Sequence, residues 1–192
     1  MANEILSVRQ KGDKCALVVI KLSEDGAAYT VSEGTYRRIG CPLSGDIIDK
    51  ESLQILEKED GERAALSRAL KILSFGDNSE RRLYSKLAAA KIKPQHARFA
   101  VEECVRLGYL CEERQLMRAV LLLAEGLLGP KKIAARLTAR GYSMKKIKLT
   151  IESLSAEGKL DFKRNKHKLI EKKLGSDADV EQKQRLLYKY GY

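Results

Sequence analysis

The sequence contains few of the residue patterns on which catalysis depends. Only two of its 192 residues are histidines: His96 falls where Lys146 stands fifty residues later, and His167 lies in a basic run, so both are expected to be solvated. The glycines form neither a GxGxxG nor a GxxxxGK(S/T) phosphate-binding loop. Carboxylate pairs such as Glu102 and Glu103 are adjacent and would point different ways on a helix. We therefore expect neither an enzyme nor a bound cofactor.

Closely spaced cysteines and long apolar runs are also missing. The four cysteines form no CxxC pair, which argues against a zinc site and a disulfide framework and suits a reducing cytoplasm. Cys104 takes a core position equivalent to Leu154, so we expect it to be buried as a small hydrophobe. No apolar run approaches the roughly 20 residues that span a membrane, and no secretory signal is recognisable. We expect a cytoplasmic monomer with no membrane partner.

The sequence does contain an internal repeat. Shifted by fifty residues it matches itself without a gap, with apolar residues on apolar residues and glycine on glycine. Examples are Leu83 and Leu87 on Ile133 and Leu137, and Gly108 and Leu110 on Gly158 and Leu160. A third copy starts near Lys163 and is one helix short at Tyr192. A self-match at a fixed period is typical of a repeat architecture.

Each full copy predicts three helices. The first has apolar residues at i, i+3, i+4 and i+7, beginning at Leu66. The second starts after Ser79, a candidate helix cap, or at the Gly129–Pro130 pair, and the third starts at Pro94 or after Ser143. No helix could bury its apolar stripe alone. The predicted fold class is mainly α, with tandem three-helix repeats in an elongated arrangement.

The first 62 residues follow a different pattern. Two β-branched, apolar stretches, CALVVIKL (15–22) and AAYTVS (27–32), flank the turn signal Asp25–Gly26 and predict a β-hairpin. Strands are expected only within about the first 35 residues, since the apolar period changes afterwards. Ser32 is expected to cap a short helix, and a further helix over residues 49–61 leads into the first repeat. The predicted organisation is therefore 1–62, hairpin and short helices; 63–112 and 113–162, full repeats; 163–192, an incomplete repeat.

Charge is distributed unevenly along the chain. The net charge is +11, but residues 1–62 carry a net −4 and residues 63–192 a net +15. No acidic residue lies between Glu125 and Glu152, a stretch with seven cations. Such asymmetry indicates that the partner is a polyanion, most commonly nucleic acid, or an acidic groove of another protein. The alternative is that these cations only form a solvated helix face. The candidate contact residues are Lys131, Lys132, Arg136, Arg140, Lys145, Lys146, Lys148, Arg82, Lys86, Lys163, Arg164 and Lys166.

From about residue 46 onward the chain resembles the RecX family, bacterial regulators of the RecA recombinase. The resemblance rests on ALKILSFGDNSERRLYSKL, VRLGYL and LLGPKKIAARLTARGYS, in this order and at fifty-residue spacing. Departures are Arg82 where an acidic residue is usual, and Cys111 with Glu112 where the family often has two aspartates. The resemblance implies tandem three-helix repeats that bind along the groove of the RecA filament on single-stranded DNA. There the family blocks filament growth or promotes disassembly, without a cofactor.

A stand-alone nucleic-acid-binding protein is the alternative. Three-helix units can resemble helix-turn-helix folds. The basic positions are mostly lysines, however, and Asn and Gln are scarce beside them, which indicates phosphate contacts rather than base readout. A RecA regulator should inhibit RecA while much of the DNA stays free, whereas a DNA-binding protein should act only by covering the DNA.

Overall fold

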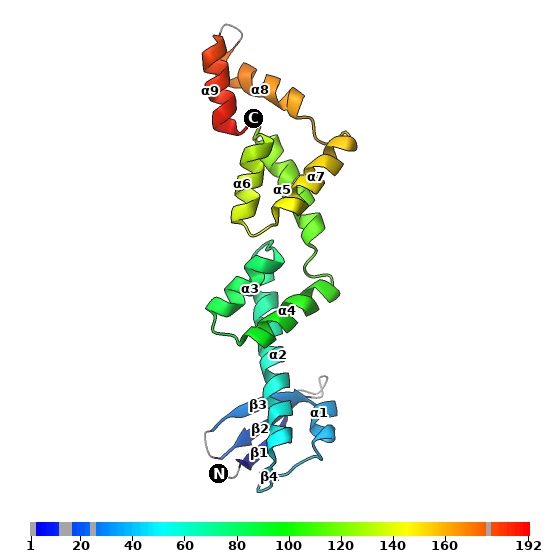
Figure 1. Cartoon of the computed structure of the whole chain (residues 1–192). Helices are drawn as coiled ribbons and strands as arrows, with labels where there is room; N and C mark the ends of the chain where they lie inside the picture. The colour runs from blue at the N-terminus through cyan, green and yellow to red at the C-terminus, as the bar shows by residue number, and fades with distance from the viewer. Residues whose placement is uncertain (1–2, 12–16, 24–25, 176–177) are drawn as a thin grey trace. The chain divides into compact units, whose positions relative to one another are not determined.

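A computed structural model describes residues 3–11, 17–23, 26–175 and 178–192 of the chain (Figure 1). The chain forms two compact units. The first holds the described residues up to Lys71 together with Leu87–Glu103, and the second holds Ile72–Lys86 together with Cys104–Tyr192. Within these residues strands lie near the N-terminus and helices dominate the rest, which confirms the mainly helical class.

The first unit contains a four-stranded antiparallel sheet. Its strands are β1 (Asn3–Lys11), β2 (Leu17–Leu22), β3 (Ala28–Ser32) and β4 (Ile47–Ile48), in the order β3-β2-β1-β4. The predicted hairpin is the β2–β3 pair, with Ile20 opposite Tyr29; its positions 15, 16 and 25 lie outside the described residues. The predicted confinement of strands to about the first 35 residues was wrong, because β4 adds a two-residue bridge to β1.

The sheet core packs against a long helix, α2 (Lys50–Ser74). Ile5, Ile20, Val31 and Leu56 form part of this core. The backbone amides of Thr30 and Ser32 donate to the Asp60 and Glu59 carboxylates at 2.9 and 2.6 Å. Ser32 also caps α1 (Glu33–Arg38), as predicted. Because α2 continues through residue 62, no element ends at the predicted domain boundary.

His96, expected to be solvated, is only 5% exposed, so that expectation was wrong. Its imidazole packs against Gly61 of α2, where a Cβ atom would lie 2.5 Å from the His96 Nε2 atom. The glycine leaves the room that the ring occupies. Lys146, fifty residues later, has its ammonium group on the surface, so the two equivalent positions differ in burial.

The starts of the remaining helices repeat with an offset of fifty residues. They are α3 (Glu80–Ala89), α4 (Pro94–Arg106), α5 (Glu112–Glu125), α6 (Pro130–Ala139), α7 (Met144–Ala156), α8 (Phe162–Leu174) and α9 (Val180–Tyr190). Each of α6, α7, α8 and α9 starts fifty residues after α3, α4, α5 and α6, respectively. Ser79 and Ser143 accept hydrogen bonds from the amides of Arg82 and Lys146, as expected for helix caps.

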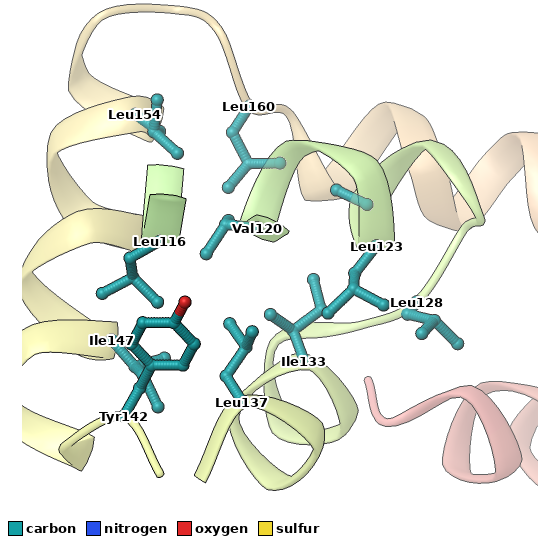
Figure 2. Packing of buried hydrophobic residues seen from close by; sticks show 11 residues of the cluster. Leu116, Val120, Leu123, Leu128, Ile133, Leu137, Tyr142, Ile147, Leu154 and Leu160 are labelled. Atoms are coloured by element: carbon teal, nitrogen blue, oxygen red, sulfur yellow. The ribbon is translucent and has the colours of Figure 1, made fainter. Parts of the chain in front are cut away.

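The core of the second unit lies among α5, α6 and α7 (Figure 2). Ile133 and Leu137, one turn apart on α6, are fully buried. Figure 2 shows the Tyr142 ring lying among Leu116, Ile147 and Leu137. Cys104 is fully buried, as predicted from its equivalence to Leu154.

None of the helices in the described part of the chain is long and apolar enough to cross a membrane.

Candidate functional site

The start of α3 and the end of α6 enclose a hollow of about 860 Å³ in the second unit. Four arginines line it, Arg81 and Arg82 from α3 and Arg136 and Arg140 from α6 and its C-cap. The other lining residues are Ser85, Thr138, Ala139 and Gly141, so the described lining carries no carboxylate. We call this site the arginine hollow. Guanidinium groups bind carboxylates and phosphates through paired N–H donors, so the hollow is suited to an anionic ligand.

The helix ends that form the hollow are held together by Ser79. Its hydroxyl accepts from the Arg82 amide at 3.2 Å and donates to the Arg140 carbonyl at 2.9 Å, and its side chain is fully buried. Gly141 follows with φ +91°, and a Cβ atom there would lie 2.5 Å from Ser79 Oγ. Only glycine allows this close approach without strain. We call the contact of Ser79 with Arg140 and Gly141 the first joint.

A carboxylate network supports the same helix start. Glu112, whose side chain is 9% exposed, accepts from the Glu80 amide at 3.2 Å and forms an ion pair with Lys146. The Lys146 Nζ atom also lies 3.7 Å from Glu80 Oε1. The hydrogen bond to Glu112 and the neighbouring negative charges raise the pKa of Lys146 despite some burial. Lys146 is thus engaged within the molecule.

The contact recurs between the start of α6 and the end of α9 (Figure 1). The Gly129 amide donates to the Tyr190 carbonyl at 2.8 Å, and the Lys131 amide to the Gly191 carbonyl at 3.1 Å. Gly191, at φ +86°, approaches Lys132 so closely that a Cβ atom would lie 2.5 Å from the Lys132 Cβ. Gly129 and Gly191 are fifty residues from Ser79 and Gly141. We call this contact the second joint.

Comparison with known proteins gives a likeness in fold. The chain matches the crystal structure of regulatory protein RecX with a TM-score of 0.69 and 18% identity, covering 100% of this chain and 95% of that one. The chain has the RecX fold. RecX from Lactobacillus salivarius gives a TM-score of 0.44 at 14% identity over 68% of this chain and 97% of that one. No family model matches the sequence. No curated protein matches it either.

Within this RecX fold, the candidate cations occupy several places. The structure brings Arg82, Arg136 and Arg140 together in the arginine hollow. Lys131 and Lys148 flank an apolar groove of about 580 Å³ between α6 and α7. Lys146 lies in the carboxylate network described above. Three further candidates have partners within the chain: Lys86 donates to Asn78 Oδ1 at 2.7 Å, Lys132 donates to the Lys189 carbonyl at 3.0 Å, and the Lys166 ammonium lies 5.5 Å from the Tyr192 ring centroid. The remaining candidates, Lys145, Lys163 and Arg164, are exposed.

Two polar residues of α3 that line the arginine hollow were not among the sequence candidates. Arg81 and Ser85 lie one turn apart on α3 and both line the hollow. The helical period could have signalled them, because residues i and i+4 share a face. Among the residues that the structure describes, no group of three or more His, Cys, Asp or Glu side chains is placed to hold a metal ion.

Proposed function

We propose that this protein regulates the RecA recombinase by binding the RecA filament on single-stranded DNA. The observation that carries the proposal is the likeness of the whole chain to regulatory protein RecX. The RecX-like motifs and the net charge of +15 over residues 63–192 support it independently of the fold. Because binding alone can shift the equilibrium between assembled and disassembled filament, such a regulator needs no catalytic group.

We further propose that residues 63–112, 113–162 and 163–192 are tandem copies of one three-helix unit, the last incomplete. The fifty-residue offset of the helix starts supports this organisation. So does the recurrence of the joint, with Gly141 and Gly191 at equivalent positions and both at positive φ. Repeats of this kind present the same helix ends at regular intervals, which suits a partner that is itself a polymer.

The arginine hollow is the proposed contact with the filament. Its four guanidinium groups face no carboxylate among the described lining residues, so they are available to an external anion. That anion is a carboxylate of RecA or a phosphate of the DNA, both of which arginine binds in fork geometry. Exposed charges add little to folding stability, so their removal should affect binding far more than the fold.

The test is a RecA ATPase and strand-exchange assay with the purified chain. The variant Arg82→Gln, Arg136→Gln, Arg140→Gln should inhibit RecA less than the parent does. A matched control, Arg9→Gln, Lys11→Gln, Lys21→Gln, removes the same charge from the exposed side of β1 and β2 and should inhibit as the parent does. Equal inhibition by parent and hollow variant would show that the contact lies elsewhere.

The same assay separates the regulator from a stand-alone nucleic-acid-binding protein. A regulator inhibits RecA at concentrations that leave most of the single-stranded DNA free. If inhibition appears only when the DNA is covered, the protein acts on DNA alone and the proposal is wrong. For a phosphate contact, each arginine removed should flatten the slope of log affinity against log salt by about 0.7 on a single strand.

A further inference from the structure

The second joint presents an aromatic ring where the first joint presents threonine. Tyr188, in the last turn of α9, is 84% exposed. Its equivalent fifty residues earlier is Thr138, which lines the arginine hollow. Burial therefore does not account for an aromatic side chain at position 188. The exposed ring is therefore available for a contact outside the chain.

Cations lie on both helix ends that form the second joint. Lys131 and Lys132, at the start of α6, are equivalent to Arg81 and Arg82 of the hollow. Lys189 is the neighbour of Tyr188, and its carbonyl accepts a hydrogen bond from Lys132 Nζ at 3.0 Å. The Tyr188 carbonyl accepts from the Gly191 amide, so the turn that carries the ring is the one that contacts α6. Lys131, Lys132 and Lys189 are all exposed.

We propose that the second joint binds single-stranded nucleic acid, with an unpaired base stacked on the Tyr188 ring and neighbouring phosphates on Lys131, Lys132 and Lys189. Exposed aromatic rings beside cations are the usual means of holding single strands without sequence preference, since every base has a face that can stack. A duplex offers the same phosphates but keeps its bases stacked on one another. Tyr188 therefore selects single strands, whereas the lysines alone would bind either form.

This inference deepens the proposed function, on which it rests for the presence of single-stranded DNA at the site. It assigns the strand to the second joint, while the arginine hollow stays available to either anion of the filament. Both joints place a glycine at positive φ against the start of an earlier helix, but the side chains at the equivalent positions Thr138 and Tyr188 differ. One fold element thus provides two sites of different selectivity.

The experiment measures binding of the full chain to a fluorescently labelled oligothymidylate by anisotropy, without RecA. Tyr188→Ala should weaken binding at least about fivefold, as expected when one stacked base loses its partner ring, and Tyr188→Phe should bind as the parent does. The matched control is Phe75→Ala, because Phe75 is 82% exposed but follows the end of α2, outside the second joint. It should bind as the parent does.

Two further ligands test stacking itself. An abasic strand of the same length should bind the parent and Tyr188→Ala equally, and so should a duplex. The salt dependence should be the same for parent and Tyr188→Ala, whereas Lys131→Gln, Lys132→Gln should flatten the slope by about 0.7 for each phosphate that is no longer neutralised. Because position 188 is exposed, the thermal unfolding of the variant should match that of the parent.

The inference is overturned if the parent does not bind the oligothymidylate at low salt, if Tyr188→Ala binds it as tightly as the parent, or if Phe75→Ala weakens binding equally. Since RecA is absent from the assay, the outcome is independent of the proposed function. Binding through Tyr188 with no inhibition of RecA would refute the regulator and keep the strand site. Inhibition of RecA without any effect of Tyr188→Ala on strand binding would refute the strand site and keep the regulator.

Discussion

The Ser79 hydroxyl donates a hydrogen bond to the backbone carbonyl of Arg140 at 2.9 Å, across 61 residues of sequence. The bond joins the positive end of the α3 dipole to the negative end of the α6 dipole, an arrangement that stabilises both helix ends. At the second joint the Gly129 amide donates to the Tyr190 carbonyl at 2.8 Å in the same way. The joint is thus a recurring contact between the start of one helix and the end of the third helix after it, and at the first joint it brings together the two helix ends that line the arginine hollow.

Ser79→Ala should destabilise the second unit more than removal of an ordinary helix cap. The substitution removes the cap on α3 and the bond to the Arg140 carbonyl together. Loss of a cap costs about 0.5–2 kcal/mol, and loss of a further buried hydrogen bond costs about 1 kcal/mol more. The measurement is the free energy of unfolding in urea, followed by circular dichroism.

Ser143→Ala is the matched control for Ser79→Ala. Ser143 also caps a helix, accepting from the Lys146 amide at 3.2 Å, but it is exposed. The difference between the two variants should therefore be about 1 kcal/mol, the contribution of the joint. Equal destabilisation would mean that the bond to Arg140 adds nothing to stability.

Gly141→Ala should disrupt the first joint. The substitution places a Cβ atom 2.5 Å from Ser79 Oγ at a backbone φ of +91°. Gly158 has φ +69° and no atom within 4 Å of the corresponding Cβ position, so Gly158→Ala measures the backbone strain alone. That strain costs about 1–2 kcal/mol, and the overlap at Gly141 should add about 1–3 kcal/mol. Urea unfolding of both variants tests this, and a smaller loss for Gly141→Ala would contradict the geometry of the joint.

Leu137→Ala should leave a cavity in the core of the second unit. The Leu137 side chain is fully buried, and Ile133 lies one turn away on the same face of α6. Truncation should cost about 2–5 kcal/mol where the surrounding side chains cannot collapse into the space. Leu149→Ala, at a position that is 55% exposed on α7, should change the free energy of unfolding by only about 0.5 kcal/mol. A loss well under 1 kcal/mol at Leu137 would show that the packing is different.

The helix starts at Ser79, Pro130 and Ser143 could be predicted because their signals are local. A cap or a Gly–Pro pair acts on the residues that immediately follow it. The two-residue strand β4 could not be predicted, because it exists only through pairing with β1, more than forty residues earlier in the chain. The same limit applies to His96: its burial depends on Gly61 of a different helix, which the fifty-residue equivalence to Lys146 does not reveal.

The residues of the candidate site could likewise be predicted only in part from the sequence. Lys132, Arg136 and Arg140 could be selected from the sequence because they lie in a stretch of seven cations with no acidic residue. Their separation could not be foreseen: Arg136 and Arg140 join Arg82 in the hollow, while Lys132 turns to the carbonyl of Lys189 at the second joint. That division arises from contacts between helix ends some sixty residues apart, which helical periodicity within one segment cannot contain.

Tyr142 should make the stability of the second unit fall at high pH. Burial raises the pKa of its phenol above 10.0, and the charges of Asp77 and Glu112 add to the effect. The unfolded chain releases this proton near pH 10, whereas the folded chain retains it to higher pH. The contribution of Tyr142 is therefore complete below pH 10 and decreases as the pH rises through the folded-state pKa. Tyr142→Phe, which keeps the ring, should make the free energy of unfolding in urea less dependent on pH between about 9 and 11. If Tyr142→Phe follows the parent profile, burial of the phenol does not couple to folding.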